Sequence, residues 1–326
     1  MTLTPSIRVP LTGMDAYLSI FGANGRNLSL LEGELGVTLA VRGSDLEISG
    51  GEEDAALAAR VVDKLTDLSA RGAQIDRTTL RYAAKLARQD ELDRLDDIAF
   101  EVVAITHRGR PVRCKTLGQY DYVRAIRGHE LTFAVGPAGT GKTYLAVAMA
   151  VKAFRSKEVS RIILTRPAVE AGEKLGFLPG DLQQKVDPYL RPLYDALFEM
   201  LGPELFARCQ ERGDIEVAPL AYMRGRTLDD SFIILDEAQN TTKEQMKMFL
   251  TRLGMGSKAV VTGDITQTDL PDGKKSGLKQ VMTILKNIDD IEIIKLSGRD
   301  VVRHRLVQEI IKAYERSEMG EDRWKK

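Results

Sequence analysis

Eight consecutive residues, Gly136 to Thr143, have the types and spacing of a loop that binds phosphate. Their sequence, Gly-Pro-Ala-Gly-Thr-Gly-Lys-Thr, matches the pattern G-x-x-x-x-G-K-[ST], with an apolar stretch before it and a helical sequence after it. The glycines would let backbone N–H groups surround a phosphate at a helix N-terminus. Lys142 would contact the β and γ phosphates, and Thr143 would give its hydroxyl to magnesium. We therefore expect ATP and Mg2+ to be held by Gly136, Pro137, Ala138, Gly139, Thr140, Gly141, Lys142 and Thr143.

A pair of carboxylates, Asp236 and Glu237, follows the apolar stretch 232–235. At the end of such a strand, the first acid can hold the magnesium shell and the second can orient and deprotonate a water. The pair predicts Asp236 as a metal ligand together with Thr143, and Glu237 as the catalytic base. Two solvated turn carboxylates are the alternative, which the phosphate-binding loop disfavours. A base beside the magnesium aspartate suits water activation, so hydrolysis is favoured over phosphate transfer to a bound hydroxyl.

Two glutamines are further candidates for contact with a nucleotide. Gln267 follows the apolar stretch 258–262, in the sequence Gly263-Asp-Ile-Thr-Gln. An acid and an amide at that place could sense the γ-phosphate, or they could cap a loop. Gln119 stands 17 residues before Gly136, where its amide could recognise the adenine edge while a neighbouring tyrosine stacks on the ring. A surface glutamine beside core tyrosines is the alternative.

The elements that would position these residues are short apolar strands alternating with helices. Their hydrophobicity is continuous rather than alternating, which is typical of strands covered on both faces in a parallel sheet. We expect these strands at residues 130–135, 161–165, 232–235, 258–262 and 292–296. The predicted fold class is therefore α/β, with a P-loop NTPase core of the RecA-like kind over residues 117–317.

The chain upstream of this core divides into two further regions. Residues 14–70 predict a small α/β domain, in which two alternating stretches are joined by a turn at Gly43 and followed by a helical stretch. Residues 71–116 predict a helical connector that ends in a basic linker containing Arg108, Arg110, Arg113 and Lys115. Residues 318–326 are expected to be a C-terminal tail.

Composition limits the partners of the chain. Lysine and arginine number 47, and so do aspartate and glutamate, so no global field draws the protein to nucleic acid or membrane. The N-terminus lacks the pattern of a signal peptide, and no stretch approaches the apolar length of a membrane span. We expect a cytoplasmic protein without a membrane partner. The spacing of Cys114 and Cys209 predicts neither a zinc site nor a redox pair.

With these residues in view, the segment 117–317 resembles the PhoH-like family of bacterial ATPases, whose core looks like the first motor domain of superfamily 1 helicases. The resemblance rests on GPAGTGKT at 136–143, LTRPAVEAGEKLGFLPGDLQQKVDPY at 164–189, ILDEAQN at 234–240, TGDITQTDLP at 262–271 and GRDVVRHRLV at 298–307. It implies a cytoplasmic ATPase linked to RNA metabolism and, in some organisms, to phosphate starvation or to a partner endoribonuclease of the YbeY kind. It also assigns Lys142 and Thr143 to ATP and magnesium, Asp236 and Glu237 to magnesium and catalysis, and Gln119 to adenine.

A second motor domain is missing from the sequence. Only 59 residues follow Gln267, which is too few for one. We expect the charge of the γ-phosphate to be stabilised by an arginine from a neighbouring subunit, in a closed homo-oligomeric ring for which a hexamer is the candidate. Arg299 and Arg303 are the candidates, with Arg166 as a rival and a solvated helix face as the alternative. Strand separation is not predicted, because it requires a second grip on nucleic acid.

Residues 18–48 also resemble a KH-type RNA-binding module, in which a Gly-x-x-Gly loop between helices clamps the nucleotide backbone. The corresponding loop is Gly22-Ala-Asn-Gly25. Its interior is not basic, and residues 1–70 carry 5 basic against 10 acidic side chains, which disfavours strong nonspecific RNA binding. Two alternatives stay open: weak or partner-assisted RNA contact, and a structural or oligomerising module. For the whole chain, the alternative to an ATPase acting on RNA is an ATP-regulated switch or scaffold with slow hydrolysis.

Overall fold

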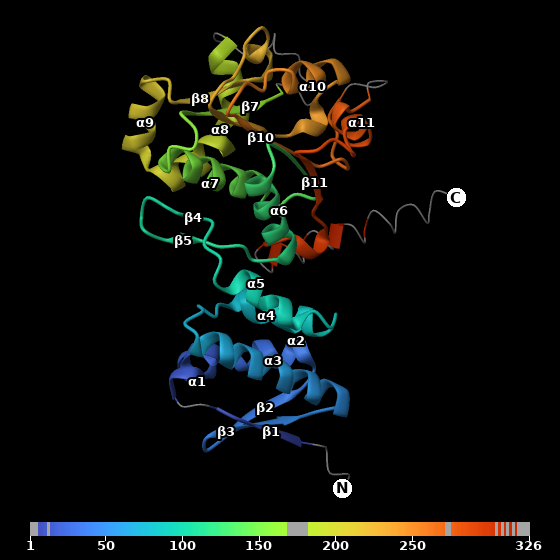
Figure 1. Cartoon of the computed structure of the whole chain (residues 1–326). Helices are drawn as coiled ribbons and strands as arrows, with labels where there is room; N and C mark the ends of the chain where they lie inside the picture. Colours follow the sequence, from blue (N-terminus) through green and yellow to red (C-terminus); the bar gives the residue numbers. More distant parts are fainter. Residues whose placement is uncertain are drawn as a thin grey trace, which may run out of the picture. The chain divides into compact units, whose positions relative to one another are not determined.

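The computed structural model describes residues 6–11, 14–167, 182–270, 275–303, 306, 307, 310, 313, 314 and 317. The chain forms two compact units (Figure 1). The first unit comprises Met1–Val102 and Arg113–Tyr120, and the second comprises Val103–Val112 and Asp121–Lys326. The predicted tail 318–326 and much of the family block 164–189 lie outside the described residues.

The first unit begins with a three-stranded antiparallel sheet and the helices beside it. The sheet order is β1-β3-β2, and the turn between β2 and β3 uses Gly43 at a φ of 64°, a conformation that suits glycine. Leu46 and Ile48 alternate along β3, are fully buried and face the helices, because successive strand residues point to opposite faces. The elements are β1 (Ser6–Pro10), α1 (Met14–Phe21), η1 (Ala23–Gly25), α2 (Leu28–Leu35), β2 (Thr38–Arg42), β3 (Asp45–Ser49) and α3 (Glu52–Ala70).

The order of these elements places the Gly22–Gly25 loop between α1 and α2. Gly22 and Gly25 both have positive φ angles, 74° and 67°, which explains why glycine occupies both positions. The loop is therefore where the sequence predicted it, ahead of two paired strands. The KH-like assignment itself stays a prediction.

The segment 71–116, expected to connect two domains, is divided between the two units. Helix α4 (Arg77–Ala87) packs on α2 and α3, and η2 (Leu92–Arg94) and α5 (Leu95–Ala99) follow it in the first unit. The expected basic linker contains β5 (Pro111–Val112), which pairs with β4 (Ala104–Ile105) just before the linker in a hairpin that belongs to the second unit. Arg155 fixes this hairpin by donating to the carbonyl of Ile105 at 2.8 Å.

The second unit contains a six-stranded sheet in the order β11-β6-β10-β9-β7-β8. Every paired strand in it is parallel, which confirms the predicted α/β fold. The strands are β6 (Leu131–Val135), β7 (Arg161–Arg166), β8 (Ile215–Pro219), β9 (Ser231–Leu235), β10 (Lys258–Gly263) and β11 (Ile291–Lys295). The sequence analysis missed β8, since this edge strand contains Glu216 and lacks the continuous apolar pattern of the inner strands.

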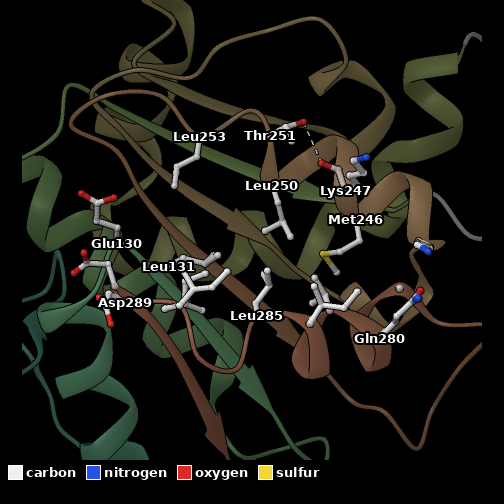
Figure 2. A pocket seen from close by; sticks show the side chains of 17 residues that line it. Glu130, Leu131, Met246, Lys247, Leu250, Thr251, Leu253, Gln280, Leu285 and Asp289 are labelled. Atoms are coloured by element: carbon white, nitrogen blue, oxygen red, sulfur yellow. Dashed lines mark hydrogen bonds between the residues drawn. The ribbon is translucent and has the colours of Figure 1, made fainter.

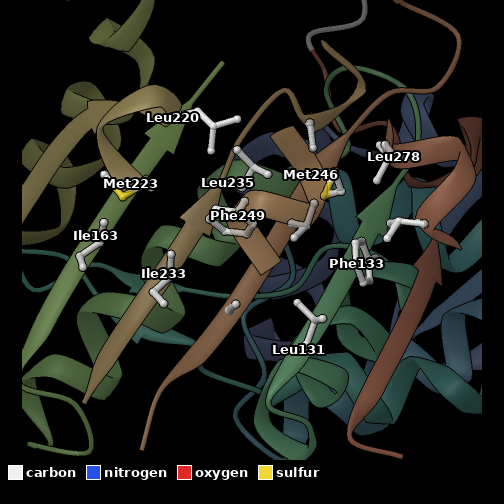
Figure 3. Packing of buried hydrophobic residues seen from close by; sticks show 14 of the residues in the cluster. Leu131, Phe133, Ile163, Leu220, Met223, Ile233, Leu235, Met246, Phe249 and Leu278 are labelled. Carbon is white, nitrogen blue, oxygen red and sulfur yellow. The ribbon is translucent and has the colours of Figure 1, made fainter. Parts of the chain in front are cut away.

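Helices cover both faces of this sheet. On one face, Phe133 and Ile233 pack with Met246 and Phe249 of α10 and with Leu278 of α11 (Figure 3). Helix α7 contacts β7, β9 and β10, and it lies on the opposite face. The helical elements of this part of the chain are α6 (Leu117–Gly128), α7 (Lys142–Arg155), α8 (Leu182–Leu201), α9 (Pro203–Glu211), η4 (Leu220–Met223), η5 (Ala238–Asn240), α10 (Lys243–Leu250), α11 (Gly277–Ile284) and η6 (Gly298–Asp300). Throughout the described ranges, no helix combines the length and apolar character needed to cross a membrane.

Candidate functional site

The loop 136–141 joins the end of β6 to the start of α7, as the sequence predicted. Gly139 and Gly141 have φ angles of 83° and 81°, so the loop needs glycine at both positions. Gly136 donates its N–H to the carbonyl of Gly263 at 3.1 Å. A Cβ on Gly136 would collide with the backbone carbonyl of Leu296. The loop is therefore fixed between the end of β10 and the segment that follows β11.

Lys142 points its ammonium group into this loop. Its Nζ donates to the carbonyls of Gly136 at 2.6 Å and of Pro137 at 2.9 Å. Burial lowers the pKa of Lys142 below its ordinary value, although the nearby carboxylates of Asp264 and Glu237 act in the opposite direction. A buried cation held by neutral acceptors is well placed to exchange them for anionic oxygens, because charge-assisted hydrogen bonds are stronger. The site thus fits a phosphate group.

Asp236 lies directly after β9 and accepts two hydroxyl hydrogen bonds on one oxygen. Thr143 and Thr262 both donate to its Oδ1 at 2.7 Å. Asp236 is only 5% exposed, so these bonds compensate for the removal of a charged oxygen from water. Together they connect the phosphate-binding loop to the ends of β9 and β10. The structure therefore brings together the two residues predicted to hold magnesium.

The backbone at the start of α7 is held by Tyr122, whose hydroxyl donates to the carbonyl of Lys142 at 3.1 Å. Tyr122 is fully buried. Burial, with a further contribution from the charge of Asp236, raises the pKa of this phenol well above its ordinary value. The hydroxyl therefore keeps its proton and remains a donor. Tyr122 is accordingly a buried core residue rather than an adenine-stacking ring.

Glu237 is held in a left-handed backbone conformation, with φ 50° and ψ 40°. Its Oε1 lies 3.3 Å from Nη2 of Arg166, and its Oε2 accepts from Nε2 of Gln239 at 2.5 Å. A positive φ is uncommon for glutamate and costs free energy, so the surrounding structure must hold it in place. The carboxylate is thereby oriented beside Asp236. Arg166 was the rival candidate for the charge-stabilising arginine. In the structure it pairs with Glu237 of its own chain.

Gln239 connects the predicted base Glu237 to the residue that follows β10, and the sequence analysis did not assign it a role. Its Oε1 accepts from the backbone N–H of Asp264 at 2.9 Å, while its amide nitrogen contacts Glu237. Asp264 is 5% exposed, and its Oδ1 accepts from the N–H and the hydroxyl of Thr266. Gln267 is exposed nearby, with its N–H donated to the carbonyl of Asp264. Gln239 is a polar residue within the family motif ILDEAQN at 234–240, and this position could have indicated a role for it.

The segment 296–303 runs along the phosphate-binding loop. Leu296 donates to the carbonyl of Val135 at 2.8 Å, and Val302 donates to the carbonyl of Gly139 at 2.9 Å. The side chain of Arg303 passes directly over Gly139 and adds positive potential at Lys142. Arg299, in contrast, is exposed within η6. Arg299 and Arg303 were the two candidates for the charge-stabilising arginine. The structure brings Arg303 to the phosphate-binding loop of its own chain.

Gln119, the candidate adenine contact, belongs to the first unit. It is 4% exposed, and its Oε1 accepts from the backbone N–H of Lys115 at 2.7 Å. Lys115 also forms an ion pair with Asp76 at 2.7 Å. The side-chain oxygen of Gln119 therefore stabilises a local turn here. Its contact with adenine stays a prediction.

Comparisons with known proteins show which proteins this chain is similar to. A family model described as PhoH-like protein matches residues 111–315, and one described as IstB-like ATP binding protein matches residues 51–169. The chain is 52% identical over 306 residues to the PhoH-like protein of Bacillus subtilis (strain 168), covering 94% of this chain and 96% of that protein. It is 54% identical over 314 residues to the PhoH-like protein of Mycobacterium tuberculosis (strain ATCC 25618 / H37Rv), covering 96% and 88%. Among solved structures, the UvsW helicase from Bacteriophage T4 matches with a TM-score of 0.34 and 12% identity, over 64% of this chain and 67% of that one.

Proposed function

The chain belongs to the PhoH-like protein family, and from that premise we propose that it binds ATP with Mg2+ at residues 136–143 and hydrolyses it. One observation carries the proposal: Thr143 and Thr262 both donate to Oδ1 of Asp236. This bond pair links the loop that would hold phosphate to the strand ends that would hold metal. The match of residues 51–169 to a family of ATP-binding proteins supports the same nucleotide.

The side chains at the site fit both ligands chemically. Lys142 can exchange the carbonyls of Gly136 and Pro137 for phosphate oxygens. The hydroxyl of Thr143 and the carboxylate of Asp236 are oxygen ligands of the kind that Mg2+ prefers. When bound, magnesium would neutralise charge on the β and γ phosphates.

In this proposal Glu237 is the base that orients and deprotonates the attacking water. Arg166 and Gln239 hold its two oxygens in defined directions. Arg303 is the arginine best placed to stabilise negative charge near the loop, because its side chain already passes over Gly139. These assignments give each polar group at the loop a separate role.

The test is steady-state phosphate release by the full chain, with and without single-stranded RNA, beside Glu237→Gln. We expect wild-type turnover and a loss of two to three orders of magnitude, roughly 10² to 10³, in the variant, since a general base contributes about 10² to 10⁴. ATP binding should persist in the variant. Glu204→Gln, at an exposed glutamate of α9, is the matched control. Equal turnover by wild type and Glu237→Gln would refute the assignment.

A second candidate function is an ATP-regulated switch or scaffold with slow hydrolysis. It is favoured by the contacts of Glu237, whose carboxylate is paired with Arg166 and bonded to Gln239 rather than directed only at water. Under this alternative, RNA leaves turnover unchanged and slow, while ATP changes assembly or partner binding. The phosphate-release experiment separates the two functions.

We place this activity in RNA metabolism, with RNA or an endoribonuclease of the YbeY kind as the partner. The loop Gly22–Gly25 between α1 and α2 supports an RNA contact in the first unit. The basic stretch 108–115 offers less free positive charge than its sequence suggests, because Lys115 is already paired with Asp76. We also propose a homo-oligomeric ring, with a hexamer as the candidate, as the working assembly.

A further inference from the structure

A long apolar groove opens on the second unit, away from the phosphate-binding loop. It has a volume of about 530 Å3 and lies between α10, α11 and the start of β6 and β11 (Figure 2). Its floor includes Leu131, Leu250 and Leu285, and the first of these belongs to the buried core. Ile284 and Ile288 line it and remain 60% and 49% exposed. Exposed apolar surface of this kind, continuous with a core, marks an interaction site.

The same chain carries a second exposed apolar surface near its C-terminus. The described residues between 306 and 317 are helical, and Val307, Ile310 and Tyr314 are 41%, 46% and 69% exposed. Their spacing of three and four residues places these side chains on one face of a helix. We call Val307, Ile310 and Tyr314 the C-terminal stripe.

Neither surface covers the other within one chain. Ile284 and Ile288 keep about half of their surface exposed in the presence of the C-terminal stripe, and the stripe is exposed to a similar degree. A groove between two helices is a kind of surface that binds an amphipathic helix, with anchors at intervals of three or four residues. Both surfaces are therefore open for a contact between copies.

Charge at the groove favours the same occupant. Glu130 and Asp289 lie at one end of the groove, and Asp290 also lines it. Residues 323–326 include three basic side chains, after four acidic ones between 315 and 322. A second copy that directs residues 323–326 toward this acidic end would bring opposite charges together. Lys258, whose ammonium donates to the carbonyls of Ile126 and His129, offsets only part of that negative charge.

We propose that the groove between α10 and α11 binds the C-terminal stripe of a second copy of this chain. The contact joins two different surfaces, so each subunit has one groove to offer and one helix to donate. Such head-to-tail contacts continue until the assembly closes into a ring or grows as a filament. This inference gives the ring of the proposed function a specific interface. It requires neither ATP binding nor hydrolysis.

The test uses sedimentation velocity of the full chain at micromolar concentration. Ile284→Glu damages the groove and Ile310→Glu damages the C-terminal stripe, at positions exposed enough to leave the fold intact. We expect the wild type to assemble and each variant alone to associate at least tenfold more weakly. Mixed in equal amounts, the two variants should form one-to-one dimers and nothing larger, since each retains one intact surface. Tyr222→Glu, at a surface position 48% exposed and outside the groove, is the control and should assemble as the wild type does.

A monomeric wild type, variants that still assemble, or a mixture that stays monomeric would each overturn the proposal. Circular dichroism verifies folding, and Ile288→Lys with Tyr314→Glu replaces any variant that fails it. ATP binding, measured separately on the same variants, should be unchanged. Failure of the interface and failure of the proposed ATPase are therefore distinguishable.

Discussion

Arg303 occupies the space where a Cβ on Gly139 would stand, so the C-terminal part of the second unit lies directly on the phosphate-binding loop. Gly139 has a φ of 83°, and its carbonyl accepts from the N–H of Val302 at 2.9 Å. Glycine is needed there both for its backbone conformation and for this close approach. An arginine of the same chain is thus already present at the loop that was expected to receive one from a neighbour.

This contact predicts that Arg303 acts within its own subunit. Arg303→Ala should lower kcat by on the order of 10³-fold, the lower end of what an arginine finger contributes. Mixing it with Lys142→Ala, which is inactive for a different reason, should restore no phosphate release if both residues serve one site. Recovery of about a quarter of wild-type activity in the mixture would instead show that Arg303 acts in a neighbouring subunit. Arg299→Ala, at an exposed position, should have a much smaller effect.

Gln239 is predicted to position Glu237 rather than to react. Its side chain spans from the carboxylate of Glu237 to the backbone N–H of Asp264. Gln239→Ala should lower kcat about 10-fold to 10²-fold with little change in the Kd for ATP, because the base loses its orientation while the phosphate contacts remain. Glu237→Gln should keep binding and lose nearly all turnover. A Gln239→Ala variant with weakened ATP binding and normal kcat would contradict this role.

The nucleotide loop and the sheet that carries it were predictable because both have strong local signals. Buried parallel strands are continuously apolar, and the loop requires glycine and lysine at fixed spacing. The strand β8 was missed because it lies at the sheet edge and contains Glu216. Local pattern alone cannot separate such a strand from a loop.

The contacts between distant segments could not be predicted. The bond from Val302 to Gly139 spans 163 positions of sequence, and that from Asp264 to Gln239 spans 25. The charge pattern of the sequence near Arg303 is compatible both with a solvated helix face and with an arginine that covers the phosphate-binding loop. The sequence therefore does not distinguish them. The pairing of Lys115 with Asp76 could not be predicted either, because the two residues are distant in the sequence. Without its acidic partner, the basic stretch has the pattern of a linker.

Lys142→Met should abolish stabilisation by ATP without weakening the nucleotide-free protein. Burial holds the native pKa of Lys142 below its unfolded value, so the charged side chain is penalised in the folded state at neutral pH. That penalty decreases as pH rises through the native pKa. Thermal unfolding should show a variant at least as stable as wild type at pH 7, with the difference narrowing in alkali. Wild type alone should gain about 2.7 kcal/mol from ATP and Mg2+ at 100 times the Kd.

Asp76 should make the first unit sensitive to acid. Burial by itself would raise the pKa of this carboxyl, but hydrogen bonds from Lys115 and from the N–H of Thr79 hold it below its ordinary value. A depressed carboxyl pKa gives stability that is present above the unfolded pKa and is lost as pH falls through the native one. Because Asp76 also caps α4, Asp76→Ala should cost about 1 kcal/mol at pH 7.

The measurement for Asp76 is hydrogen exchange of the α4 amides between pH 3 and pH 7, about the range in which aspartate titrates, with rates corrected for intrinsic pH dependence. Wild type should be better protected than Asp76→Ala at pH 7, and the difference should shrink toward pH 3. Asp63→Ala, at an exposed aspartate of α3, should leave α4 unchanged throughout. A difference between wild type and Asp76→Ala that stays constant with pH would mean that the charge of Asp76 contributes nothing beyond its capping hydrogen bond. In that case Lys115 would be a surface cation available to a polyanion rather than a structural partner of α4, and the RNA contact proposed for the first unit would gain one positive charge.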